Sequence, residues 1–222
     1  MDSLYDISLN PEDFGIETTD FEISSDAALS SRQKLLIGCV LDLFKGRPTL
    51  KKLQLWDENA TFNDPLTMAT GRKQYQAQWY GLKAAFSEIE QLKAIVLTSG
   101  NPMHLFVKTR YKVKCIGFEK IISSDVKIYM DSLERHITGV DDLWNGEIPC
   151  GAIAKVGVFQ ILNPFWWLFL AGEVGFWVFS LVWWTRLWKV FRNLNSVVVP
   201  IFVRTPKLMN EEAEKNKKTQ LL

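Results

Sequence analysis

The side chains of this sequence that can transfer protons are acids, histidines and tyrosines spread over its first two thirds. Proton transfer at carbon requires a general base near the carbon and a donor that stabilises the developing oxyanion. The candidates for these roles are Asp64, Asp131, Asp142, His104, His136, Tyr80, Tyr111 and Tyr129. The helix or strand that carries each residue decides which of them meet in one site.

Asp142 is the preferred catalytic candidate. Alternation along the strand predicted within residues 137–144 places it on the same face as Val140 and Trp144. Burial in an apolar pocket raises a carboxyl pKa toward neutrality, where the group can act as an acid or a base. Asp64 precedes Pro65 and also suits a turn. The residues predicted to line a pocket are Asp64, Tyr80, Tyr111, Asp131 and Trp144.

Several kinds of site have no support in the sequence. It contains no phosphate-binding glycine loop, no zinc-ligand spacing, no Ser-His-Asp motif and no nucleophile elbow. Cys39, Cys115 and Cys150 are odd in number and far apart, which favours reduced thiols over disulfides. We therefore expect no metal and no cofactor. A net charge of +1 and the absence of a recognition motif argue against a nucleic-acid partner.

Hydrophobic periodicity predicts helices first and strands afterwards. Helical spacing covers residues 31–45, 48–56 and 72–86, and Ser30 or Ser31 suits the cap of the first helix. Alternation then predicts strands at 95–98, 104–115 and 125–131, and one within 137–144. This order indicates an α+β domain over residues 31–150, in which helices are followed by an antiparallel meander.

Both ends of the chain are strongly charged. Eight acidic residues precede the first basic residue, Arg32, so we expect residues 1–30 to form an acidic, disordered arm. This start lacks the basic and apolar regions of a secretory signal, which predicts a cytosolic main domain. Residues 193–222 are expected to contain a strand-like stretch followed by a charged tail.

Residues 151–192 form a hydrophobic segment that we expect to contact a membrane. Residues 156–185 include one formal charge, Glu173, and a helix needs about 20 apolar residues to cross a bilayer. Tryptophan favours the headgroup region. The residues predicted to contact lipid are Trp166, Trp167, Trp177, Trp183, Trp184 and Trp188.

The topology of this segment stays open between two arrangements. A single span would place Lys155 and the basic cluster after residue 185 on opposite sides, and would require export of the whole domain. A re-entrant hairpin that bends at residues 172–175 keeps both sides cytosolic, and it is the preferred arrangement. The alternative without a membrane is a segment packed against the domain or against a second subunit.

Two sets of residues carry a resemblance to a known family. They are the run Asp42-Leu43-Phe44-Lys45-Gly46-Arg47-Pro48 with Phe62-Asn63-Asp64-Pro65-Leu66 and Gly71, and the final Asp141-Asp142-Leu143-Trp144-Asn145-Gly146. Over residues 30–150 the chain resembles the nuclear transport factor 2-like superfamily, which includes ketosteroid isomerase-like and SnoaL-like proteins, and in particular its fungal members. Val140 stands where related sequences often carry a histidine.

The resemblance implies a cone-shaped domain whose helices and bent sheet enclose a pocket, and pairing of two copies through the sheet. The resemblance alone does not determine the function. Three hypotheses follow: a membrane-bound module that binds an apolar or lipid-like molecule, an isomerase or cyclase that uses a pocket carboxylate on an apolar carbonyl compound, and a non-catalytic scaffold whose pocket is filled.

Overall fold

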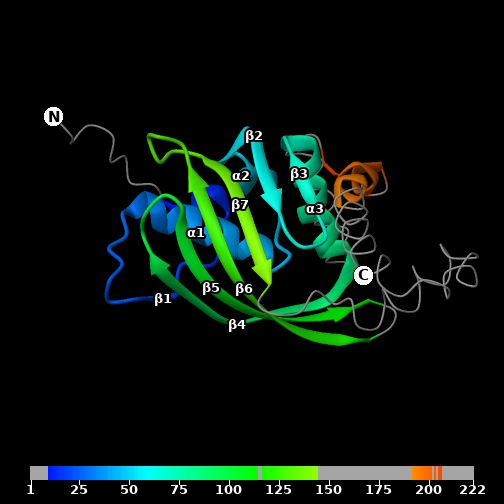
Figure 1. Ribbon diagram of the computed structural model, residues 1–222, viewed down its shortest axis with the longest axis horizontal. Coiled ribbons are helices and arrows are strands. Elements are labelled where there is room, and N and C mark those ends of the chain that lie inside the picture. Colours follow the sequence, from blue (N-terminus) through cyan, green and yellow to red (C-terminus); the bar gives the residue numbers. More distant parts are fainter. Residues whose placement is uncertain (1–9, 115–116, 145–191, 202, 204, 207–222) are drawn as a thin grey trace, which may run out of the picture.

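A seven-stranded sheet curves around a layer of helices in the computed structural model of the protein (Figure 1). The structure describes residues 10–114, 117–144, 192–201, 203, 205 and 206. The α+β class is therefore confirmed.

The sheet has the order β1-β4-β5-β6-β7-β2-β3. Its strands are β1 (Glu22–Ile23), β2 (Trp56–Asn63), β3 (Met68–Thr70), β4 (Phe86–Thr98), β5 (Met103–Val113), β6 (Glu119–Met130) and β7 (Ile137–Trp144). Most neighbours are antiparallel, but β1 pairs with β4 and β2 with β7 in parallel. The predicted antiparallel arrangement is confirmed for β4 to β7. The two parallel pairs were not predicted; they are possible because long connections separate β1 from β4 and β2 from β7.

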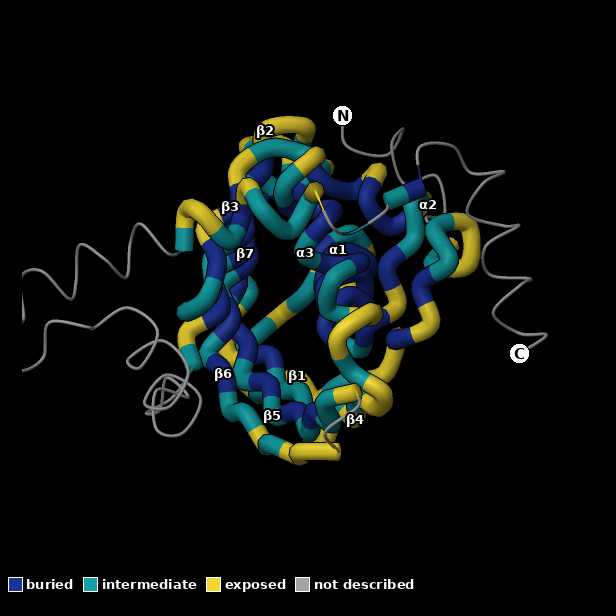
Figure 2. The backbone as a smooth tube through the Cα atoms, turned by 90° about the vertical axis from the view of Figure 1, so that its right-hand side faces the viewer, coloured by how far each residue is buried: buried dark blue, intermediate teal, exposed yellow. Residues whose placement is uncertain are grey.

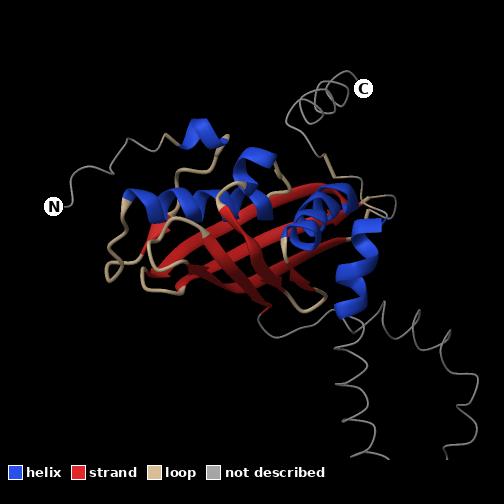
Figure 3. Ribbon diagram, turned by 90° about the horizontal axis from the view of Figure 1, so that it is seen from above, coloured by secondary structure: helices blue, strands red, loops and turns tan. Residues whose placement is uncertain are grey.

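The sheet bends where its register shifts. The β4–β5 ladder shifts at three places, and the β6–β7 ladder shifts between Tyr129 and Met130. Such irregularities bend a strand and increase its twist. The helices lie on one side of the sheet (Figure 3), so the bend creates a concave face that they cover.

The three main helices follow the predicted order. α1 (Ser31–Phe44) begins at a capping box in which Ser30 and Gln33 exchange hydrogen bonds, as its sequence predicts. α2 (Leu50–Leu53) is shorter than expected, and α3 (Arg72–Ala85) has the predicted length. Both longer helices pack their apolar residues toward the sheet.

Buried positions alternate with less buried ones along the strands (Figure 2). A group of aromatic rings also belongs to the interior. Met103, Leu105 and Val107 of β5 are buried, so alternate residues of this strand face the interior. Trp79 of α3 lies with its ring centroid 4.4 Å from that of Phe62 and 5.3 Å from that of Phe44. These three rings line one side of the cavity described below.

The described part of the acidic arm is ordered. It contains a 3-10 helix, η1 (Pro11–Phe14), and strand β1, and Ile16 is buried. The buried Asp42 carboxylate accepts the Glu17 amide at 2.8 Å and the Thr18 hydroxyl at 2.7 Å. The prediction of disorder is therefore wrong for residues 10–30, because α1 supplies specific partners that composition does not reveal.

The described C-terminal residues form a helix over positions 192–201 instead of the predicted strand-like stretch. Within residues 10–144 and 192–206, as far as they are described, no helix is long and apolar enough to span a membrane. The hydrophobic segment up to residue 191, with its six tryptophans, and the charged tail from residue 207 lie outside the described residues.

Candidate functional site

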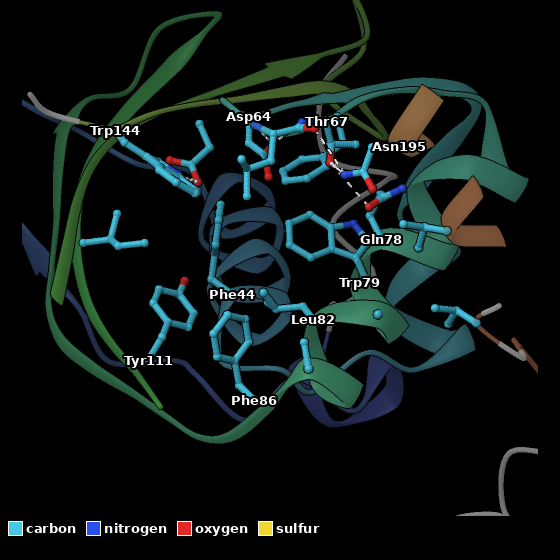
Figure 4. A pocket seen from close by; sticks show the side chains of 18 residues that line it. Phe44, Asp64, Thr67, Gln78, Trp79, Leu82, Phe86, Tyr111, Trp144 and Asn195 are labelled. Atoms are coloured by element: carbon cyan, nitrogen blue, oxygen red, sulfur yellow. Dashed lines mark hydrogen bonds between the residues drawn. The ribbon is translucent and has the colours of Figure 1, made fainter. Parts of the chain in front are cut away.

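A cavity of about 390 Å³ lies between α1, α3, the concave face of the sheet and the helix 192–201 (Figure 4). Its walls are largely apolar. The apolar lining consists of Phe44, Phe62, Leu66, Trp79, Leu82, Ala85, Phe86, Ile122, Val199 and Val203. The other lining residues are Asp64, Thr67, Gln78, Gly81, Tyr111, Asp142, Trp144 and Asn195. A volume of this order suits a small-molecule site.

Asp142 is a buried carboxyl group on the cavity wall. It is 5% exposed, and its Oδ2 accepts the Trp144 indole N–H at 2.9 Å. Its Oδ1 is buried and has no hydrogen-bond partner among the described residues. Burial raises the pKa of Asp142 to about 7; the polar groups of Ser124 and Trp144 oppose the increase, and the charge of Asp64 adds to it. Trp144 thus holds Oδ2, and the Ser124 side chain lies close enough to favour the ionised carboxylate.

Tyr111 points its hydroxyl into the cavity from β5 (Figure 4). Its ring packs against Phe86, with the centroids 5.0 Å apart. Burial raises the pKa of the phenol, and the charge of Asp142 raises it further. The hydroxyl therefore remains protonated at neutral pH and can donate a hydrogen bond to an oxygen atom in the cavity.

Asp64 serves first as a turn residue. Its Oδ1 accepts the backbone N–H groups of Leu66 at 2.7 Å and Thr67 at 2.5 Å. Burial raises the pKa of Asp64 to about 6, while these two N–H groups and the charge of Arg192 act in the opposite direction. The loop it shapes connects β2 to β3 and positions Thr67 on the cavity wall.

The helix 192–201 closes one side of the cavity through polar contacts to this loop. The Asn195 amide donates to the Leu66 carbonyl at 3.2 Å and to Thr67 Oγ1 at 3.0 Å, and Arg192 donates to the Thr67 carbonyl at 3.1 Å. The Thr67 hydroxyl lies 3.5 Å from Gln78 Oε1. Residues more than a hundred positions apart in the chain therefore complete one wall.

The predicted site residues fall into two groups. Asp64, Tyr111, Asp142 and Trp144 line the same cavity. Tyr80 is buried outside the lining. Asp131 belongs to the β6–β7 turn, where its carboxylate accepts the Arg135 amide at 2.6 Å and lies 3.4 Å from His136.

The polar lining residues Thr67, Gln78 and Asn195 were not predicted, and neither was Trp79, whose apolar ring carries an N–H group. Gln78 and Trp79 lie on α3, where helical periodicity indicates burial but does not distinguish core from cavity. Asn195 follows the hydrophobic segment, and nothing in the sequence indicates that this part returns to the domain. Among the described residues, no group of three His, Cys, Asp or Glu side chains is arranged to hold a metal ion.

No protein-family model and no curated protein sequence matches the chain. Solved structures with similar folds include an NTF2-like protein from Anabaena variabilis, with 11% identity over 56% of this chain and 97% of the other at a TM-score of 0.47. A steroid delta-isomerase from Pseudomonas aeruginosa has 11% identity over 55% and 85%, with a TM-score of 0.42. A putative SnoaL-like polyketide cyclase from Shewanella putrefaciens has 14% identity over 52% and 80%, also with a TM-score of 0.42.

These similarities concern the fold, and the chemistry must be argued from the cavity itself. The cone implied by the resemblance is present: helices cover the concave face of a bent sheet and enclose a pocket.

Proposed function

We propose that the cavity binds an apolar small molecule that carries an oxygen function. The observation that supports this most directly is the buried Asp142 Oδ1, which has no hydrogen-bond partner among the described residues and belongs to the wall of a largely apolar cavity. A buried polar atom without a partner costs free energy, so a ligand hydroxyl or carbonyl group that interacts with this end of the cavity gains affinity. The apolar walls supply the remaining binding energy.

The binding test uses 6-ethyl-2-naphthol, an apolar fluorescent probe with one hydroxyl group. Ala85 and Ala84 are both exposed, but only Ala85 belongs to the cavity lining. Ala85→Trp therefore places an indole at the exposed rim of the cavity, whereas Ala84→Trp introduces the same group outside the lining. We expect the wild type and Ala84→Trp to bind the probe equally, and Ala85→Trp to bind it at least about 10-fold more weakly. Absence of binding to the wild type, or equal affinities for all three proteins, would contradict the proposal.

A second candidate function is proton transfer at carbon, which the raised pKa of Asp142 favours. A carboxyl group with a pKa of about 7 is ionised in a large fraction of molecules at neutral pH, as an efficient general base requires. Asp142 would remove a proton from the carbon next to a ligand carbonyl, while the Tyr111 hydroxyl donates to the oxygen that gains charge. Return of the proton to another carbon of the same conjugated system would complete an isomerisation without a cofactor.

This step is tested by hydrogen–deuterium exchange at the α-carbon of 1-tetralone in D₂O. The wild type should accelerate exchange, and Asp142→Asn should lose about 100-fold or more of that acceleration. Asp141→Asn is the matched control, because Asp141 contacts Asn63 and Tyr129 instead of the cavity. If the wild type binds the ketone without exchange, the protein is a binding module and the catalytic candidate fails.

Membrane attachment through residues 151–192 is part of the same proposal. The sequence of this segment and its tryptophans support it, and the cytosolic placement of the domain follows from the preferred hairpin. Trp144, just before the undescribed residues, lines the cavity, and Arg192, just after them, contacts the cavity-lining Thr67. A ligand dissolved in the bilayer would then have a short path to the cavity.

A further inference from the structure

The cavity has a second polar end, on the side opposite Tyr111 and Trp144. Figure 4 shows Thr67, Gln78 and Asn195 together on that side, with Trp79 beside them. Two of these residues carry buried nitrogen atoms that have no hydrogen-bond partner among the described residues, namely Gln78 Nε2 and Trp79 Nε1. Trp79 is only 1% exposed. Both nitrogens are donors, and both belong to residues that line the cavity.

Hydrogen bonds fix the orientation of the Gln78 amide. Asn195 Nδ2 donates to Thr67 Oγ1 at 3.0 Å, which leaves the Thr67 hydroxyl hydrogen free to point elsewhere. The acceptor for that hydrogen is Gln78 Oε1, which lies 3.5 Å from Thr67 Oγ1. Because the oxygen of the Gln78 amide accepts from Thr67, its NH₂ group is the end that remains without a partner.

We infer that Gln78 Nε2 and Trp79 Nε1 form a donor subsite that takes an acceptor oxygen of the ligand, a carbonyl, hydroxyl or ether. This inference rests on the proposed function and specifies its ligand class. The ligand is an elongated apolar molecule with an oxygen at each end, one toward Asp142 and Tyr111 and the other toward Gln78 and Trp79. The aromatic rings between the two ends accommodate its apolar middle.

The physical reason is the cost of the unpaired donors. A buried N–H group that loses water and gains no partner destabilises the bound state, and a molecule with a single oxygen leaves one end of the cavity unsatisfied. A second oxygen removes that penalty without changing the size of the molecule. Two probes of similar shape that differ only in one oxygen should therefore bind with different affinities, and the probe with the second oxygen should bind more tightly.

The experiment compares 6-acetyl-2-naphthol, which has oxygens at both ends, with 6-ethyl-2-naphthol, which lacks the carbonyl. Dissociation constants are measured by fluorescence titration with the full chain. We expect the wild type to prefer the acetyl probe by about 10-fold. Gln78→Met keeps the length of the side chain and removes the donor, so the preference should fall to about 3-fold or less. Trp79 is unsuited to substitution because its ring packs against Phe44, Trp56 and Phe62.

Gln74→Met is the matched control. Gln74 lies on the same helix, does not line the cavity, and accepts the Thr70 amide at 2.9 Å. This variant should keep the full preference for the acetyl probe. If the wild type binds both probes equally, the donor subsite is overturned and the binding function stands. If neither probe binds, the proposed function and the subsite fail together. A Gln78→Met protein that retains the full preference also overturns the subsite.

Discussion

Asp142 is a carboxyl group that the cavity walls keep away from water. Burial raises its pKa from 3.8 to about 7, so the folded protein holds a proton that the unfolded chain releases near pH 4. Between these two values the folded state binds more protons than the unfolded state. The free energy of unfolding therefore falls as pH rises from about 4 to 7, and the contribution of Asp142 is constant above that range.

The first prediction concerns this pH dependence. The difference between 3.8 and about 7 corresponds to at most about 4 kcal/mol. Asp142→Asn carries no charge at any pH and keeps an acceptor for the Trp144 indole. We expect this variant to be more stable than the wild type by about 2–4 kcal/mol at pH 8, and by less than half that difference at pH 5. Urea unfolding at the two pH values measures the difference.

Asp141→Asn serves again as the control, because Asp141 is partly exposed and the variant should show the wild-type pH dependence. Parallel pH profiles for Asp142→Asn and the wild type would mean that Asp142 is ionised normally in the folded protein. In that case the case for general base catalysis would also be lost.

Among single residues, the sequence predicts the cavity positions of Asp142, Trp144 and Tyr111 better than those of the other lining residues. Tyr111 lies on β5, where burial alternates from residue to residue. Asp142 and Trp144 lie on β7, where the alternation is less regular but still places Val140 and Asp142 inward. Asp131 is a carboxylic acid like Asp142, so residue type alone could not exclude it from the site. Its contacts to Arg135 and His136 show that it belongs to a turn. Glutamine is a common surface residue, so the sequence does not mark Gln78 as part of a site. Its place beside the cavity is recognised only from the contacts that join Gln78, Thr67 and Asn195.

Among the elements, α1 and α3 each carry a glycine in a very different environment. A Cβ atom at Gly38 would lie 2.4 Å from the Thr18 carbonyl oxygen and 2.9 Å from Ile16, because residues 16–18 press directly against α1. A Cβ atom at Gly81 would lie 3.4 Å from Val199 and 3.5 Å from Val203, which is ordinary contact. Replacement of glycine by alanine should therefore change the free energy of unfolding in opposite directions in the two helices.

The second prediction follows from this contrast. Alanine in a helix is worth up to about 1 kcal/mol relative to glycine. Gly81→Ala should raise the free energy of unfolding by about 0.5–1 kcal/mol. Gly38→Ala should lower it by about 1–2 kcal/mol, because displacement of a packed backbone segment outweighs the helical gain. Chemical denaturation of both variants measures these values, and stabilisation by Gly38→Ala would show that residues 16–18 are not held on α1.

The elements that sequence analysis predicted well are long and regular. α1 and β7 have strong periodicity and were placed to within one or two residues. β4 was predicted only over its last four residues because Glu88, Glu90 and Lys93 hide its alternation. β1 and β3 have two and three residues and carry no periodic signal, so only their pairing partners define them.

For the whole molecule, the open question is whether the domain is held at a membrane. The prediction is that the full chain made in eukaryotic cells floats with membranes and resists alkaline carbonate extraction, whereas a chain that lacks residues 152–190 does not. The deletion ends before Arg192 so that the contacts of Arg192 and Asn195 to the β2–β3 loop are kept.

Binding of 6-ethyl-2-naphthol by the shortened chain shows that the domain is intact, so a change in fractionation then reports on the segment alone. A full chain found in the soluble fraction would refute membrane attachment and favour packing of the segment against the domain or a second subunit. Pairing through the sheet also stays a prediction, which the oligomeric state of the shortened chain in analytical ultracentrifugation tests.

The contacts of the helix 192–201 have a practical consequence for protein engineering. The chain leaves β7 at Trp144 and rejoins the domain at Arg192, and both ends lie at the walls of one cavity. Trp144 and Arg192 are therefore two anchored points in the chain, between which another domain can be inserted. A circularly permuted fluorescent protein placed there would be tied to the cavity on both sides, and its emission would report occupancy by a ligand.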